Sequence, residues 1–168
     1  MTDLIRIANC SGYYGDKLSA AKEMVEGGPI DVLTGDYLAE LTMTILFNQR
    51  MQRGEDKGYV GTFLKQIKEI AHTCKSKNIK VVTNAGGLNP QSMANEIEKI
   101  LAELKIDLKV AYITGDDLMP RMENLIQLNE PFNNIDKGTP LQESDCHTLT
   151  ANAYLGAVSY THLRAHET

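Results

Sequence analysis

Short runs of β-branched and other apolar residues alternate with longer amphipathic stretches, and this alternation restricts the fold more than any other feature of the chain. Four such runs are expected to be strands: residues 4–8, 30–33, 79–82 and 108–113. Each is followed by a stretch long enough to cross back over a sheet, which is what parallel strands require. The sequence therefore predicts an α/β fold, a mostly parallel, Rossmann-like sheet with flanking helices.

Helical periodicity is expected between these strands, with apolar residues three and four positions apart on one face. In chain order the inward faces comprise Leu18, Ala21, Met24 and Val25; Leu38, Leu41, Ile45 and Leu46; Phe63, Ile67, Ile70, Ala71 and Cys74; and Met93, Ile97, Ile100, Leu101 and Leu104. A short helix holding Met122, Leu125 and Ile126 is expected later, and another is expected to begin within residues 148–157.

Several residues predict where these helices begin and end. Asp16 is expected to cap the first helix, and the second is expected to run from about Leu38 through Gln52. The third should end near Asn78. Asn89 followed by Pro90 is a strong start signal for the fourth, because Asn accepts from a free backbone N–H and Pro suits the first helical position.

Two polar segments are expected to be loops. Residues 49–60 carry two glycines and read as a surface loop and a mobile lid, and residues 129–146 are rich in turn-forming residues.

Composition excludes several classes of function. The 168 residues include 42% apolar residues, enough for a hydrophobic core, and 17 Lys and Arg against 22 Asp and Glu give a net charge of -5. Without a basic cluster, a nucleic-acid groove or an anionic-membrane surface is disfavoured. Cys10, Cys74 and Cys146 form no CxxC pair, which is typical of reduced thiols, and no signal or membrane-spanning segment is evident. We expect a cytoplasmic protein.

The last eleven residues, 158–168, have neither helical nor strand periodicity. They back-translate into DNA that resembles the adapter attached to fragments in transposase-based sequencing libraries. We therefore interpret them as an artefact and exclude His162 and His166 from any metal site. Residues 1–157 are then expected to be the N-terminal part of a longer α/β domain, incomplete by itself and inactive.

Polar clusters follow each expected strand. They are Asn9-Cys10-Ser11-Gly12, Thr34-Gly35-Asp36, Asn84-Ala85-Gly86-Gly87 and Thr114-Gly115-Asp116-Asp117. Parallel sheets bind ligands at the carboxyl ends of their strands, so these clusters are expected to line one edge. The expected site comprises Asp36 and Asp116 as catalytic residues and Asn9, Ser11, Gly12, Asn84, Gly86 and Gly87 as binding residues.

Each of these residues has a second interpretation. Gly86 and Gly87 before a capped helix would expose N–H groups to a phosphate or carboxylate, or would merely turn the chain. Asn84 would orient a carbonyl or a ribose hydroxyl. Asp36 and Asp116 would hold a divalent cation, act as general base or cap the next helix, whereas Asp117 favours capping.

Thiols and histidines are weaker candidates. Cys10 is more simply a half-buried thiol than a nucleophile, and His72 is expected at the surface. A metal site formed by Cys146, His147 and a distant Asp has little support, so no metal ligand is assigned.

Four blocks carry a family resemblance: residues 7–16, 31–40, 83–90 and 152–157. Over residues 3–157 the chain resembles the N-terminal domain of the acyclic terpene utilisation family, AtuA. The resemblance implies a cytoplasmic bacterial catabolic protein that degrades citronellol- and geraniol-type terpenes through CoA thioesters. It carries over no residue roles.

Two functions follow as hypotheses. The first is an enzyme domain of acyclic terpenoid or related branched acyl-CoA catabolism, with a CoA thioester or a divalent metal as ligand. The alternative is a noncatalytic ligand-binding or assembly subunit of the same pathway, which would expose apolar patches. The expected partner is a small-molecule or acyl-CoA substrate, with no nucleic acid and no membrane, and a homo-oligomer remains open.

Overall fold

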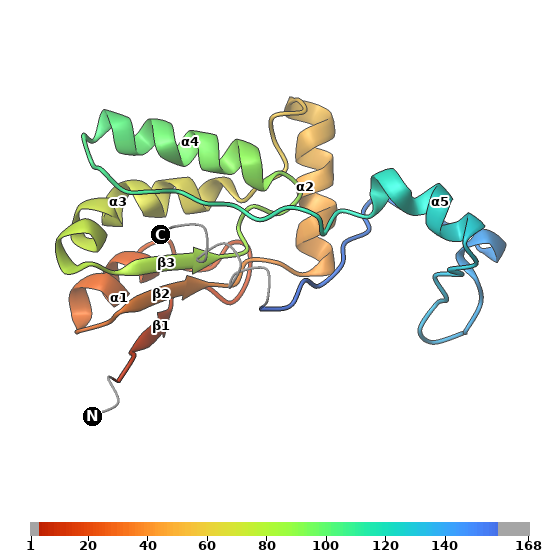
Figure 1. Ribbon diagram of the computed structural model, residues 1–168, viewed down its shortest axis with the longest axis horizontal. Coiled ribbons are helices and arrows are strands. Elements are labelled where there is room, and N and C mark those ends of the chain that lie inside the picture. Colours follow the sequence, from red (N-terminus) through yellow and green to blue (C-terminus); the bar gives the residue numbers. More distant parts are fainter. Residues whose placement is uncertain (1–3, 158–168) are drawn as a thin grey trace. The chain divides into compact units, whose positions relative to one another are not determined.

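The computed structural model describes residues 4–157, which fall into two compact units that divide between Tyr112 and Ile113. The first unit contains the whole sheet and the four longer helices (Figure 1). The second contains short helical segments and loops. The segment 158–168, which the sequence marks as foreign, lies outside the described residues, so its interpretation stays a prediction.

A three-stranded sheet forms the centre of the first unit. Its strands are β1 (Ile7–Asn9), β2 (Val32–Gly35) and β3 (Lys80–Thr83), in the order β1-β2-β3. Both pairings are parallel, and Ala8, Leu33 and Val81 share one row of the register. The expected α/β fold is confirmed. Each strand begins later than expected, and in β1 the apolar Leu4 and Ile5 stay outside the ladder, 83% and 67% exposed.

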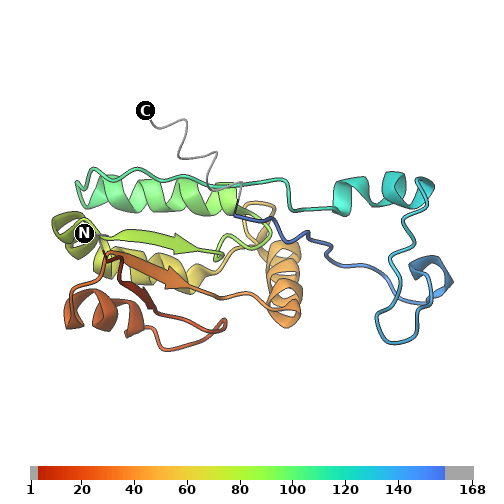
Figure 2. The same cartoon turned by 60° about the horizontal axis from the view of Figure 1, so that its bottom comes forward.

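Four helices accompany the sheet: α1 (Ala20–Gly27), α2 (Glu40–Arg53), α3 (Gly61–Lys77) and α4 (Pro90–Glu103). Helix α3 packs between α1 and α4, and α1 also contacts β1 and β2 (Figure 2). Within the described residues, none of the helices is both long and apolar enough to cross a bilayer.

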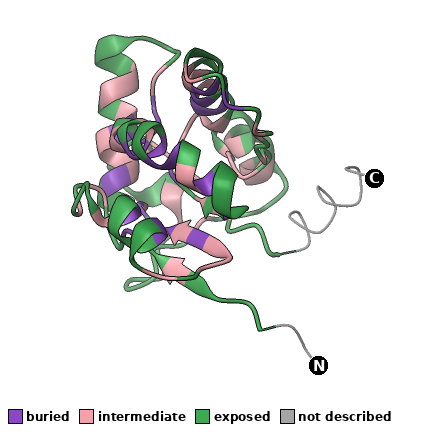
Figure 3. Cartoon of the chain, turned by 90° about the vertical axis from the view of Figure 1, so that its left-hand side faces the viewer, coloured by how far each residue is buried: buried purple, intermediate pink, exposed green. Residues whose placement is uncertain are grey.

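The core lies between the helices and one face of the sheet (Figure 3). Leu33 in the central strand is completely buried, as are Leu46 of α2 and Ile70 of α3. The opposite face of the sheet is open: Ile7 and Val82, which point away from the Leu33 row, are 66% and 42% exposed. The described residues therefore cover the sheet on one face only.

The expected inward faces are confirmed for α3, where all five apolar positions are buried, and partly for the other helices. Leu18 and Met24 are exposed, so α1 buries only Ala21 and Val25. Leu41 is 72% exposed because α2 turns Thr42 and Leu46 inward instead. The sequence thus predicted the presence of these helices better than it predicted which of their apolar residues are buried.

The expected cap of α1 is wrong. Helix α1 begins only at Ala20, after Ser19. The Asp16 carboxylate instead accepts from the backbone N–H groups of Gly12 and Lys17, at 3.0 and 2.7 Å. It therefore closes the loop that precedes the helix.

The expected loop over 49–60 is wrong at both ends. Residues 49–53 belong to α2, and residues 58–60 are buried rather than on the surface. The remainder is fastened to the chain before α4: Val60 N–H donates to Ala85 O, Leu88 N–H to Gly58 O, and the Asn89 amide to Glu55 O and Lys57 O. These bonds describe an anchored loop and lend no support to a mobile lid.

The expected fourth strand over 108–113 is also wrong. No ladder forms there in the described chain, although Leu108 and Val110 pack against the core. An apolar run shows that a segment is buried, but it does not show which strand it would pair with. The polar cluster at 114–117 therefore does not follow a strand.

The second unit confirms a short helix and contradicts another. Helix α5 (Met122–Gln127) contains the three expected apolar residues and follows the 3-10 turn η1 (Met119–Arg121). The loop over 129–146 contains a turn over residues 135–137 and the 3-10 turn η2 (Leu141–Glu143). Residues 148–157 form no helix, because Asn152 makes an antiparallel bridge to Asp117 and Ala153 N–H donates to Asp116 O.

Candidate functional site

The carboxyl ends of β1 and β2 are joined by backbone hydrogen bonds. Cys10 N–H donates to Thr34 O at 2.8 Å, and Asp36 N–H donates to Ser11 O at 3.0 Å. The pairing of the two strands therefore continues into the loops that follow them. This continuation places the first two polar clusters side by side at one edge of the sheet.

Asn9 links these two loops through its side chain. Its amide donates to Ser11 O at 2.9 Å, and its oxygen accepts from the Thr34 hydroxyl at 3.1 Å. The same hydroxyl lies 3.2 Å from Ala8 O. Both polar groups of Asn9 are thus engaged in fixing the edge.

Asn84, at the end of β3, holds the loop after β2. Its oxygen accepts from Tyr37 N–H at 2.8 Å, and its amide donates to Asp36 Oδ1 at 2.6 Å. Asp36 Oδ1 also accepts from Leu38 N–H at 3.2 Å. Asp36 itself is exposed, and its Oδ2 has no partner among the described residues.

Asn9, Ser11, Asp36 and Asn84 therefore form one hydrogen-bonded group, which we call the strand-edge network. It connects all three strands of the first unit. Four of the expected site residues are brought together in it, and it contains an oriented carboxylate with one free oxygen, the arrangement that a general base requires.

Ser11 and Gly12 occupy the turn after β1. The Ser11 hydroxyl is buried and donates to Tyr13 O at 3.0 Å, while Gly12 is exposed and gives its N–H to Asp16. The backbone N–H groups of Gly12 and Lys17 both donate to the Asp16 carboxylate and hold its pKa below the ordinary value. The polar groups of this turn are thus mostly engaged within the turn itself.

Two residues of this region were not expected from the sequence. Tyr37 lies beneath the edge, 2% exposed, and its hydroxyl donates to the buried Gln66 of α3 at 2.5 Å. Gln66 in turn donates to Leu18 O. A glutamine within the apolar face of α3 was the available signal, because a buried amide requires polar partners.

Cys10 also lies in this buried layer. Its sulfur is 3.7 Å from the Tyr37 hydroxyl, and burial raises the pKa of both groups. A thiol that resists ionisation is a poor nucleophile, so the structure favours the buried-thiol interpretation.

Gly86 and Gly87 are closely packed. A Cβ on Gly86 would lie 2.7 Å from Pro90 Cβ, and Gly87 has φ of +53° with its α-carbon against Leu46. The N–H groups of Gly87, Leu88 and Asn89 donate to Asn84, Gly58 and Gly86. The turn interpretation explains both glycines, and their binding role stays a prediction.

Asp116 lies in the second unit. Its carboxylate accepts from the Asn152 amide at 3.0 Å, and Asp117 accepts from Met119 N–H at the start of η1, as a capping residue would. The strand that was expected to bring Asp116 to the sheet edge is absent, so its catalytic role has no support from the fold.

The weaker candidates are found at the surface. His72, Cys146 and His147 are all exposed. Over the described residues, no group of three or more His, Cys, Asp or Glu side chains is placed to hold a metal ion.

Comparison with known proteins gives a family but no annotated relative. No curated protein and no solved structure matches the chain. Residues 5–162 match the family described as acyclic terpene utilisation family protein AtuA. The chain therefore belongs to the AtuA family, whose description ties it to the utilisation of acyclic terpenes.

Proposed function

We propose that the protein is an enzyme of acyclic terpenoid or related branched acyl-CoA catabolism, located in the cytoplasm, with the strand-edge network as its active site. Family membership supports the pathway. The orientation of Asp36 by Asn84 and Leu38 supports the site, because a general base must be held in place with one oxygen free. In this proposal Asp36 removes a proton from the bound thioester, and Asn84 is a positioning residue.

The test is turnover of citronellyl- and geranyl-type CoA thioesters by the full-length protein, followed by mass spectrometry. Asp36→Asn should lower the rate about 100-fold or more, the usual range for losing a general base. Asp107→Asn is the matched control, since Asp107 is an exposed carboxylate outside the network. Unfolding by urea should be nearly unchanged in both variants. A fully active Asp36→Asn protein would refute the proposal.

A second candidate is the noncatalytic binding or assembly subunit. The open face of the sheet, with Ile7 and Val82 exposed, favours it, because uncovered apolar surface often marks an interaction site. It predicts that the wild-type protein binds a thioester without converting it. Binding by calorimetry together with absent turnover by the full-length protein would select this function over the enzyme.

A further inference from the structure

A pocket of about 310 Å³ lies at the start of α3, and we call it the α3 pocket. None of the four strand-edge residues is among its lining residues. Its lining includes three cations and two aromatic rings, with a hydroxyl on the first turn of the helix: Arg53, Lys57, Lys65, Tyr14, Tyr59 and Thr62. No carboxylate is among the lining residues. The chain has a net charge of -5, so a pocket whose charged lining residues are all cations is locally positive in a protein that is negative as a whole.

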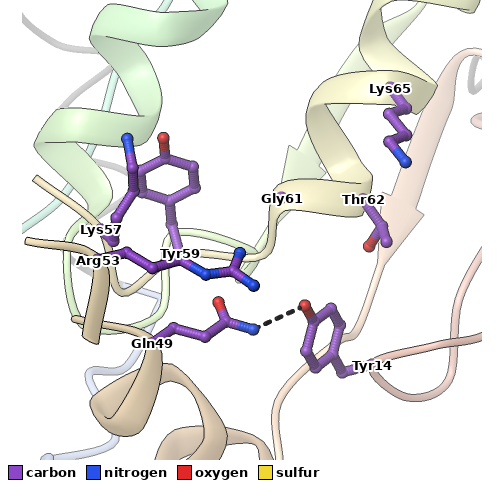
Figure 4. A pocket seen from close by; sticks show the side chains of 8 residues that line it. All are labelled: Tyr14, Gln49, Arg53, Lys57, Tyr59, Gly61, Thr62 and Lys65. Carbon is purple, nitrogen blue, oxygen red and sulfur yellow. Dashed lines mark hydrogen bonds between the residues drawn. The ribbon is translucent and has the colours of Figure 1, made fainter. Parts of the chain in front are cut away.

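Two of the three cations have no internal partner. Lys57 pairs with Asp56, but Arg53 and Lys65 make no ion pair or side-chain hydrogen bond with any described residue. They come from different helices, Arg53 from the end of α2 and Lys65 from α3, and approach the pocket from two sides (Figure 4). Their positive charges therefore remain available to a bound anion.

The Tyr14 hydroxyl of the pocket is also available. Tyr14 accepts from the Gln49 amide at 3.2 Å and leaves its own proton free (Figure 4). Tyr59 is only 7% exposed, and its hydroxyl has no hydrogen-bond partner in the described chain. In Figure 4 this hydroxyl lies beside Lys57 and points away from Tyr14 and Thr62, so Tyr59 contributes its ring to the α3 pocket.

Helix α3 adds backbone donors to this set. Its N-cap, Val60, offers no side-chain acceptor, and the first turn contains no acidic residue. The N–H groups of Gly61 and Thr62 make no hydrogen bond to any described residue. Free N–H groups at the positive end of a helix favour an anion.

We propose that the α3 pocket binds the phosphate or diphosphate group of a small organic ligand. Arg53 and Lys65 neutralise the anion, the backbone N–H groups of Gly61 and Thr62 donate to its oxygens, and the two tyrosine rings contact the organic part. The pocket volume is at the lower end of the range for small-molecule sites. This proposal goes beyond the proposed function and does not rest on it.

The experiment is isothermal titration calorimetry of the full chain at low salt, with inorganic phosphate, inorganic pyrophosphate and ADP as probes. We expect saturable binding of pyrophosphate or ADP at one site. Tighter binding of ADP would identify a phosphoester as the source, and tighter binding of pyrophosphate would identify the free anion. Failure of both to bind would overturn the proposal.

Variants then locate the site. Arg53→Gln should weaken binding about tenfold and Lys65→Gln about threefold, because a charged donor to phosphate is lost in each case. Lys68→Gln on α3 and Arg121→Gln in the second unit are matched controls, since both residues are exposed and neither lines the pocket. Equal losses in the controls would show mere attraction by net charge and would overturn the proposal.

Thr62→Asp separates binding from folding. A carboxylate in the first turn of α3 should raise the melting temperature, because it interacts favourably with the helix dipole. The same carboxylate should abolish pyrophosphate binding by occupying the place of the anion. Retained binding in a stable Thr62→Asp protein would contradict the proposal, and none of these variants touches the strand-edge network.

Discussion

Helices α3 and α4 begin close to the same loop, yet their first turns are built in opposite ways. At the start of α4, the Asn89 side chain accepts from Ser92 N–H at 3.1 Å. The preceding N–H groups all have acceptors as well, which are the carbonyl groups of Asn84, Gly58 and Gly86. At the start of α3, the N-cap is Val60 and the first N–H groups have no partner among the described residues. The N–H groups at the start of α4 are thus paired within the chain, whereas the first N–H groups of α3 remain unpaired among the described residues.

The difference teaches that a strong capping signature and an anion site compete for the same donors. Gly86-Gly87 and Asn89-Pro90 make α4 the obvious cradle in the sequence, but the N–H groups of Gly87 and Asn89 close the turn itself. The N–H of Leu88 donates to Gly58 in the loop before α3. Helix α3 has no such signature, and for that reason its donors remain free. The variants below test this contrast.

The largest expected effect comes from adding one methyl group at each helix start. Gly87→Ala should lower the free energy of unfolding by about 3 kcal/mol, because φ of +53° is unfavourable for Ala and the Cβ would lie 2.9 Å from Gly58 O. Gly61→Ala should raise it by about 0.5 kcal/mol, because nothing lies within 4 Å and Ala restricts the unfolded chain. Urea unfolding measures both changes in free energy. Changes of the same sign would contradict the contrast between the two helix starts.

Removing the cap of α4 should have an intermediate effect. Asn89→Ala should cost about 1–2 kcal/mol in urea unfolding, because Ser92 N–H loses its acceptor and two carbonyl groups lose their donor. Asn89→Ser keeps the acceptor but not the amide donor, and it should recover about half of the loss. If Asn89→Ala unfolds like the wild type, the closed start of α4 is of no energetic importance.

The smallest effect concerns the charge of the α3 pocket. The ion pair lowers the pKa of Asp56 and raises that of Lys57, so the stabilisation of the pair is lost only below the ordinary carboxyl range or above the ordinary lysine range. Asp56→Asn releases Lys57 and should tighten pyrophosphate binding about threefold at low salt, with the gain lost at high salt. Calorimetry at pH 8 measures the change. Weaker binding would contradict the idea that the positive charge of Lys57 attracts the anion.

Helices α3 and α4 were predictable because each carries a long periodic stripe with an end signal. Phe63, Ile70 and Cys74 are all buried as expected, and Asn89 caps α4. Three of the four expected strands were found but misplaced by one to three residues, because hydrogen bonding continues into polar residues such as Asn9 that an apolar pattern does not include.

The strand-edge network was predictable as a set of positions, since parallel strands bring their carboxyl ends together. Its bonds were not, because Asn84 and Asp36 are far apart in the sequence. The expected fourth strand misled the assignment of Asp116. The α3 pocket was missed because Arg53 was assigned to a loop, whereas the structure extends α2 through it and directs it toward Lys65 across the pocket.

The anchoring of the loop before α3 bears on how fast a ligand arrives. Opening that loop would break the bonds that Val60, Leu88 and Asn89 make across it. Entry into the α3 pocket therefore proceeds without a gating step, as diffusion into a site that already exists. The association rate should then rise with ligand concentration without reaching a plateau, and it should fall steeply with ionic strength, as electrostatic steering requires.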